Sequence, residues 1–120
     1  MPNIVSQKEY ISKINKVIDY VNKNLSEKIN LDKLAEIACF SPYHFHRIFT
    51  AIINETPVDY VLRVRLEKAA NVFVSNNEIS ITEIAFDCGF TSVALFSRTF
   101  KKHFGVSPKE FRNQLNNSKN

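Results

Sequence analysis

Four side chains in the first half of the chain, Tyr43, His46, Arg47 and Thr50, are spaced to share one exposed face of a helix. They offer an aromatic ring, an imidazole, a guanidinium and a hydroxyl, which are groups that contact base edges and phosphates. The stripe therefore predicts a DNA-reading surface. Alternatively, Arg47 forms a surface salt bridge while Tyr43 packs partly on a neighbour, and the stripe alone leaves that alternative open.

Basic charge is concentrated in the second half of the chain. The 120 residues carry a net charge of +4. Residues 1–60 hold seven Lys or Arg against seven Asp or Glu, whereas residues 61–120 hold nine against five. Between residues 91 and 112, Glu110 is the only acidic residue against five basic ones, Arg98, Lys101, Lys102, Lys109 and Arg112. A local basic surface favours a polyanionic partner such as double-stranded DNA, although a solvated face would show the same run.

The elements that must position these groups are expected to be helices. Two glycines and four prolines are too few for many hairpins. Capping signals predict helix starts at Ser6 with Glu9, Asn30, Ser41-Pro42, Thr56-Pro57, Ser80 with Glu83, Thr91-Ser92, and Ser107-Pro108. The second helix should run from Leu31 to about Ala38, and the long fourth from Pro57 to about Val74. The predicted fold class is all-α, with about seven helices and no strand.

Apolar residues at helical spacing predict which side chains enter the core. The first helix offers Tyr10, Ile11, Ile14, Val17, Ile18, Val21 and Leu25, and the third offers Phe45, Ile48, Phe49 and Ile52. The long helix offers Val58, Leu62, Leu66, Ala69 and Phe73, and the helix after Ser92 offers Phe96, Phe100 and Phe104. Ile84 is expected in the core as well.

An internal repeat is the strongest signal in the sequence. Leu34-Ala35 recurs 50 residues on as Ile84-Ala85, and the run of residues 45–49 recurs 51 residues on as 96–100. Residues 56–60 recur as 107–111. Each unit consists of a short helix, a tight turn, a longer helix and a proline-capped helix. Two units are too few for a solenoid, so the pattern indicates a duplicated binding module.

Each unit has the pattern of a helix-turn-helix. A small residue, Ala35 or Ala85, stands where two helices would cross closely, and the turn follows four residues later at Cys39 or Gly89. Such a turn needs a left-handed residue, which glycine provides without steric cost. We therefore expect a positive φ at both positions.

Other chemistry finds little support. His44 and His46 diverge by about 200° on a helix and cannot share a metal, and neither cysteine lies in a CxxC motif, so no metal site or cofactor is expected. A redox-sensing cysteine is possible, but a buried structural thiol is favoured. No motif of an enzyme family occurs, so the chain is not expected to be an enzyme. Without a secretory signal or an apolar run of bilayer length, a reducing, cytoplasmic location is expected, with no membrane partner.

Three stretches resemble the DNA-binding domain of the AraC/XylS family of bacterial transcription regulators. They are LDKLAEIACFSPYHFHRIF, YVLRVRLEKAA and ITEIAFDCGFTSVALFSRTFKKHFGVSPKEFR. The resemblance covers residues 14–115. It implies two helix-turn-helix subdomains joined by a long helix, with recognition helices in successive major-groove segments on one face of the DNA.

The resemblance also implies base-reading positions. In the first unit they fall on Tyr43, His46 and Arg47; in the second they fall on Val93, Ala94, Leu95 and Arg98. Apolar side chains can touch a thymine methyl group but read little else. Together with the charge pattern, the expected DNA-binding residues are Tyr43, His46, Arg47, Thr50, Val93, Ala94, Ser97, Arg98, Lys101 and Lys102. Cys39 departs from the glycine usual at that turn.

The sequence predicts a first helix-turn-helix region at 1–56, a linker helix at 57–75, a second helix-turn-helix region at 76–115 and a disordered tail at 116–120. The predicted function is a sequence-specific transcription regulator, an activator, that binds DNA as a monomer and has RNA polymerase as a further candidate partner. The alternatives are a helical protein-interaction module, or the DNA-binding fragment of a larger ligand-responsive regulator.

Overall fold

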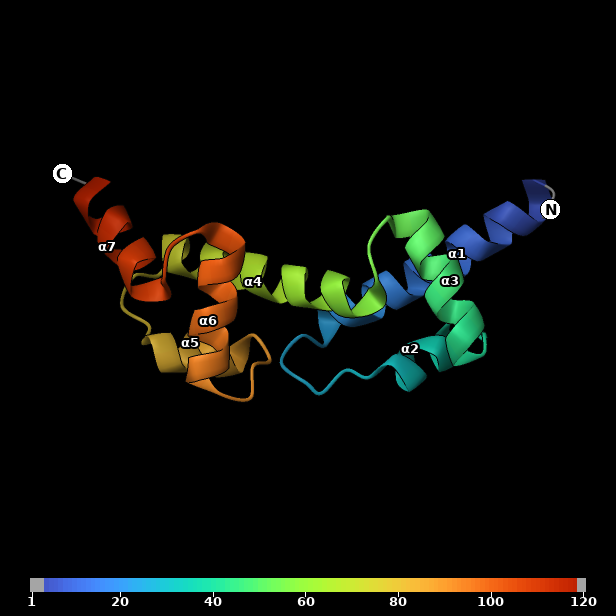
Figure 1. Ribbon diagram of the computed structural model, residues 1–120, viewed down its shortest axis with the longest axis horizontal. Coiled ribbons are helices and arrows are strands. Elements are labelled where there is room, and N and C mark those ends of the chain that lie inside the picture. Colours follow the sequence, from blue (N-terminus) through green and yellow to red (C-terminus); the bar gives the residue numbers. More distant parts are fainter. Residues whose placement is uncertain (1–3, 119–120) are drawn as a thin grey trace. The chain divides into compact units, whose positions relative to one another are not determined.

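A computed structural model describes the backbone of residues 4–118 and the side chains of residues 7–118. Within that range the chain forms seven α-helices and no strand, which confirms the all-α prediction (Figure 1). The helices are α1 (Ile4–Lys23), α2 (Leu31–Ile37), α3 (Pro42–Ile53), α4 (Pro57–Ser75), α5 (Ile81–Asp87), α6 (Val93–Phe104) and α7 (Pro108–Ser118).

The chain folds as two compact units, residues 1–62 and 63–120. The boundary lies inside α4, so its first residues pack with the first unit and the rest with the second. The sequence-based division instead gave this helix a region of its own, 57–75.

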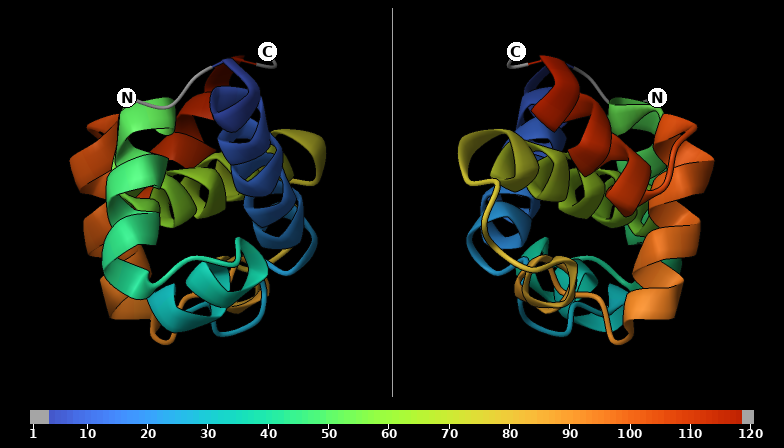
Figure 2. Two further views of the ribbon diagram at one scale, coloured as in Figure 1. Left: turned by 90° about the vertical axis from the view of Figure 1, so that its right-hand side faces the viewer. Right: turned by 90° about the vertical axis from the view of Figure 1, so that its left-hand side faces the viewer.

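The core of the first unit lies where α1, α2 and α3 meet, as the left view of Figure 2 shows. Phe45 and Phe49 of α3 are fully buried, and Tyr60 of α4 meets Phe49 edge to face at 5.5 Å between ring centroids. The first helix contributes Ile14, Val17 and Val21. This packing fixes which face of α3 turns inward.

The second unit repeats this arrangement with α4, α5 and α6, and adds α7 (Figure 2, right). Its core is an aromatic cluster of Phe73 of α4, Phe100 of α6 and Phe111 of α7, whose ring centroids lie within 5.8 Å of one another. Phe96 is fully buried beside Phe90. Each aromatic side chain removes a large apolar area from water, which a unit this small needs.

The duplication seen in the sequence is also present in the hydrogen bonds. Ser41 caps α3 by accepting from the His44 amide at 3.2 Å, and Ser92 caps α6 by accepting from the Leu95 amide at 3.1 Å. Asn30 and Ser80 cap α2 and α5 in the same way. At their C-termini, α3 ends on left-handed Asn54 and α6 on left-handed Gly105, two residue types that accept this conformation.

The two turns are also alike, and the predicted positive φ is confirmed at both. Cys39 has φ 60° and Gly89 has φ 94°. After each turn, the Phe40 and Phe90 amides donate to the carbonyls of Ala35 and Ala85, both at 3.0 Å. Cys39 therefore adopts a glycine-like conformation while carrying a side chain.

Replacing Cys39 by glycine should stabilise the first unit. A left-handed non-glycine residue costs about 1 kcal/mol, and the exposed Cys39 side chain contributes little packing. The gain is partly offset by the greater unfolded-state freedom of glycine. We expect the thermal midpoint to rise by a few degrees for Cys39→Gly. The matched variant Cys39→Ala keeps the Cβ at positive φ and should show no gain; an equal gain for alanine would contradict the strain.

Several burial predictions are wrong. Val58 is 67% exposed because α4 turns Val61 inward instead, and Ile52 is 38% exposed at the end of α3. Ile11 is also exposed. Tyr10, Ile18, Ile48, Leu62 and Phe104 are only half-buried. Phe45, Phe49, Leu66, Ile84, Phe96 and Phe100 are all buried as predicted.

Two predicted helix ends are also wrong. The helix α1 spans Ile4–Lys23, so the backbone is already helical before Ser6, where the start was predicted. At the other end, α7 continues through Ser118, so residues 116–118 are helical rather than disordered. Residues 119 and 120 of the predicted tail lie outside the described range.

Candidate nucleic-acid interface

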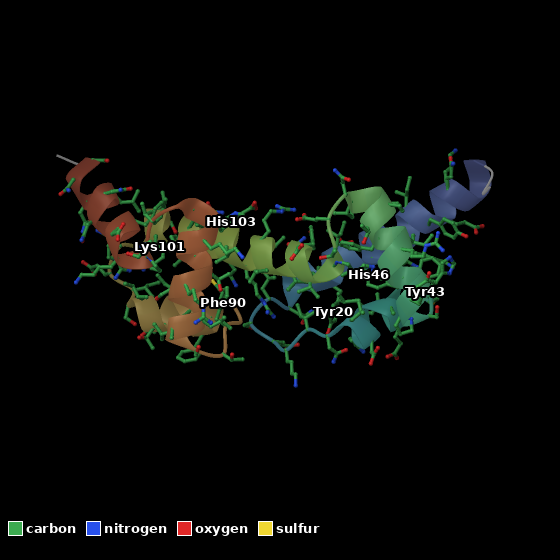
Figure 3. All side chains as sticks on the ribbon, viewed as in Figure 1. Tyr20, Tyr43, His46, Phe90, Lys101 and His103 are labelled. Carbon is green, nitrogen blue, oxygen red and sulfur yellow. The ribbon has the colours of Figure 1, made fainter. Side chains whose placement is uncertain are left out.

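The helix α3 exposes Tyr43, His46 and Arg47 to solvent, and Figure 3 marks Tyr43 and His46 on it. Phe45 and Phe49 bury the opposite face, so the core itself turns these three side chains outward. Tyr43 is 73% exposed, which is unusual for a large ring and leaves it available to a partner. The stripe predicted from the sequence is therefore exposed at these three positions.

Arg47 contacts a ring and no acidic side chain. Its guanidinium lies over the Tyr43 ring, with Cζ 5.9 Å from the centroid. Among the described residues it forms no ion pair. The alternative prediction, a surface salt bridge of Arg47, is therefore wrong for the described residues. The in-plane N–H groups of Arg47 remain available to acceptors outside the chain.

Thr50 does not continue the stripe as predicted. It is half-buried, and its Oγ1 is enclosed without a hydrogen-bond partner. The fourth position of the stripe is therefore partly covered. Thr50 can contribute less to a surface than the sequence suggested.

The corresponding helix α6 has a different character. Ala94, Leu95 and Arg98 are exposed, whereas Val93 and Ser97 are half-buried. Lys101 and Lys102 are exposed in its last turn, and Figure 3 marks Lys101 there. Lysine ammonium groups are point charges that suit phosphates, while a guanidinium can also recognise a base edge. Lysines and apolar side chains thus dominate this face.

Arg112 does not belong to the basic surface that the charge count suggested. Its guanidinium packs over the Phe73 ring at 5.0 Å and donates from Nη2 to the Ile79 carbonyl. The residue is half-buried, and its Nε has no partner. Arg112 joins α7 to the segment before α5. The basic residues exposed along this part of the chain are Arg98, Lys101, Lys102 and Lys109.

Sequence reasoning missed how the start of α3 is held. His44 lies against Phe40 at 5.0 Å and Tyr10 at 6.2 Å between ring centroids, and Lys13 stands over Phe40. These contacts join α1, the turn and α3 immediately beside Tyr43. The aromatic types are visible in the sequence, but Tyr10 and Phe40 are 30 residues apart, and no local pattern relates them.

An apolar groove of about 350 Å³ lies between α1 and α3 of the first unit, and it was also missed. Its lining residues are Gln7, Tyr10, Ile11, Ile48, Ala51 and Ile52. By the repeat, Ile48, Ala51 and Ile52 correspond to Thr99, Lys102 and His103 of α6. The fold therefore does not require apolar side chains at these positions. The contrast between the two repeats was the signal in the sequence that could have indicated the apolar groove.

The two cysteines have different environments and form no disulfide. Cys39 is exposed, whereas Cys88 is fully buried at the end of α5. Burial raises the pKa of the Cys88 thiol, an effect that the charges of Lys68 and Arg65 only partly oppose. Burial likewise lowers the pKa of Arg65. A raised pKa keeps Cys88 protonated and unreactive, as expected of a structural thiol.

A thiol reagent should therefore distinguish the two cysteines. We expect a disulfide reagent such as Ellman's reagent to modify Cys39 in the folded chain and Cys88 only after unfolding. The pKa of the Cys88 thiol is raised in the folded chain. The free energy of unfolding therefore contains the full contribution of the protonated thiol below the ordinary thiol pKa, and this contribution is lost as the pH rises through the raised pKa. Cys39→Ala should remove the fast reaction. Two thiols reacting rapidly in the folded wild-type chain would contradict this assignment.

Within residues 4–118, no group of three or more His, Cys, Asp or Glu side chains is arranged to hold a metal ion. In the same part of the chain, no helix has both the length and the apolar content required to cross a membrane.

Comparisons with known proteins show which domain family and which fold the chain resembles. The family model described as a helix-turn-helix domain matches residues 34–114. The chain is 38% identical over 96 residues to the bifunctional transcriptional activator/DNA repair enzyme AdaA of Bacillus subtilis, covering 80% of this chain. It spans 45% of that relative's length, less than half.

Solved structures share the fold. An AraC-type transcriptional regulator from Chromobacterium violaceum superposes with a TM-score of 0.78 at 29% identity, covering 87% of this chain and 92% of the other. The DNA-binding domain of AdpA, solved in complex with a target DNA, superposes with a TM-score of 0.78 at 24% identity, covering 85% and 91%. The second likeness concerns the fold alone.

Proposed function

We propose that this chain, which belongs to the AraC-type family of helix-turn-helix DNA-binding regulators, binds DNA sequence-specifically. In this proposal α3 and α6 enter successive major-groove segments. The observation that carries the proposal is the exposed stripe of Tyr43, His46 and Arg47 on a helix whose other face is fully buried. These side chains combine donors with a flat ring, as base edges require.

The two candidate recognition helices play unequal parts in this proposal. The first unit reads sequence through Tyr43, His46 and Arg47. The second unit anchors on phosphate through Lys101 and Lys102. Its residues Val93, Ala94, Ser97 and Arg98 lie beside the DNA major groove. Because both helices belong to one chain and differ in side chains, a monomer suffices and the site need not be a palindrome. We expect a site of about 20 bp, with the helices about one DNA turn apart, roughly 34 Å.

A gel shift with the purified chain tests this function. The probe is a duplex from upstream of the chain's own coding region, and the competitors are unlabelled copies of that duplex and of unrelated DNA. The proposal expects a single shifted band with one chain per duplex, displaced by the specific competitor at much lower concentration. Equal displacement by both competitors would remove the claim of sequence-specific reading.

We further propose that the protein activates transcription by contacting RNA polymerase through the apolar groove of the first unit. Ala51 follows Arg47 by one turn and borders the reading stripe. Ile48 and Ile52 lie on a different face of α3, more than a quarter of a turn from Tyr43, His46 and Arg47. The groove can therefore be covered while the reading stripe is occupied. The matched relative AdaA is named a transcriptional activator, which agrees with this role.

Substitutions in the groove should separate activation from DNA binding. We expect Ile11→Ser with Ile52→Ser to leave affinity for the preferred duplex within about twofold, because neither residue lies on the reading stripe. Transcription from a template carrying that site should fall to near its basal level. The exposed apolar residue Val74, outside the groove, provides the matched control Val74→Ser. Full activation by the groove variant would exclude this contact.

A further inference from the structure

The pairing of Tyr43 with Arg47 has no counterpart in the second unit. In the repeat, Ala94 stands at the position of Tyr43, and Arg98 at that of Arg47. Arg98 is exposed, and among the described residues no aromatic ring lies beneath its guanidinium. The two units thus have arginines in the same register, and one of them has a ring four residues earlier.

The Tyr43 ring is placed to restrict Arg47 without using its donors. Residues four apart are neighbours on a helix surface, and the guanidinium lies 5.9 Å from the ring centroid. A cation above a ring interacts through its face, so the N–H groups at the guanidinium edge stay free. A carboxylate partner would instead occupy those donors, and Arg47 has none among the described residues.

Restricting a long side chain before binding lowers the ordering cost when the complex forms. A flexible arginine can meet phosphates in many orientations, whereas reading guanine requires two N–H groups aimed at O6 and N7. Orientation therefore matters more to a base-reading arginine than to a phosphate-binding one. The ring under Arg47 and the missing ring under Arg98 fit those two tasks.

We propose that Tyr43 is a positioning residue whose ring holds the Arg47 guanidinium in the orientation that reads a guanine edge. This inference rests on the proposed function, since it concerns the same DNA contact. It narrows the part that the proposed function gives to Tyr43, because the residue then contributes to reading through Arg47 and makes no base contact of its own. The discrimination supplied by the first unit should therefore depend on the ring of Tyr43 and not on its hydroxyl.

A double-mutant cycle tests the inference. The full chain is titrated, by fluorescence anisotropy, against its preferred duplex and against duplexes carrying single base-pair changes. For Tyr43→Leu, which keeps bulk and loses the ring, we expect discrimination at the Arg47-dependent base pairs to fall about two- to fivefold, as an exposed cation–π contact allows. Tyr43→Phe should keep wild-type discrimination. In the Arg47→Ala background, Tyr43→Leu should have no further effect on discrimination.

Control variants separate a failure of this inference from a failure of the proposed function. Val74→Leu changes an exposed apolar residue outside both candidate recognition helices and should leave Arg47-dependent discrimination unchanged. Because Tyr43 is largely exposed, thermal midpoints should stay equal across the set. Additive effects of Tyr43→Leu and Arg47→Ala, or a Phe variant as weak as the Leu variant, would overturn this inference while the proposed function stands. A wild-type chain that binds all duplexes alike would overturn the proposed function and this inference with it.

Discussion

Replacing Arg47 by alanine should flatten the preference of the protein among DNA sites while leaving its non-specific binding largely intact. A bidentate arginine–guanine contact discriminates by about 1–3 kcal/mol, which is about 5- to 150-fold in the ratio of dissociation constants. Arg47 is exposed and makes no ion pair within the described chain, so the substitution removes little from the folded state. Competition titrations with preferred and altered duplexes measure the ratio directly.

The matched control is Arg98→Ala, which removes the same side chain from the same register of the second unit. We expect this variant to lose affinity for all sequences to a similar small extent. If substitutions at Val93, Ala94 or Arg98 alter the preferred site more than those at Tyr43, His46 or Arg47, the assignment of roles to the two units is reversed.

Removing Lys101 and Lys102 together should weaken binding to every sequence alike. Both are exposed in the last turn of α6, and ammonium groups on phosphates carry no sequence information. Each lost phosphate contact should reduce the slope of log affinity against log salt by about 0.9. Affinities of the double alanine variant between about 50 and 200 mM salt, for preferred and unrelated duplexes, provide the measurement.

A second pair of lysines tests whether the position of the charges or the net charge of the chain governs the salt dependence of DNA binding. Lys16 and Lys23 are exposed on α1, and replacing both lowers the net charge of the chain by the same amount. We expect the salt slope of that variant to match the wild type. Equal losses of slope for the two pairs would mean that overall charge, and not the end of α6, governs the salt dependence.

Much of the fold could be predicted because the sequence encodes it locally. Ser41 and Ser92 are hydroxyl residues directly before a helix, and their capping bonds need no distant neighbour. The repeat extended this information, since Gly89 indicated the backbone conformation of Cys39. Apart from the start predicted at Ser6, the capping signals were therefore predicted correctly.

Predictions failed where burial depends on a distant segment. Periodicity alone cannot tell which apolar residues a neighbouring helix covers, so Val58 and Ile52 were expected inside although both are exposed. Arg112 was counted among the basic surface, but its position over Phe73, 39 residues earlier, follows from the packing of α7 on α4. Such long-range contacts carry no signature in the local sequence.

The candidate site was predictable in part. The exposed positions Tyr43, His46 and Arg47 followed from helical spacing around Phe45 and Phe49. Spacing also placed Tyr43 and Arg47 close together, but only the structure shows the guanidinium over the ring. Thr50 was expected on the exposed stripe but is half-buried, because helical spacing does not show which side chains a neighbouring segment covers.

The central claim is that one chain reads sequence with α3 and anchors with α6. The most direct test is the binding free energy of the wild-type chain for every single base-pair change across its preferred site, repeated for Arg47→Ala and Arg98→Ala. We expect the largest penalties to cluster in one major-groove segment, to vanish in Arg47→Ala and to persist in Arg98→Ala. A cluster that survives the loss of Arg47 and disappears with Arg98 would contradict this claim.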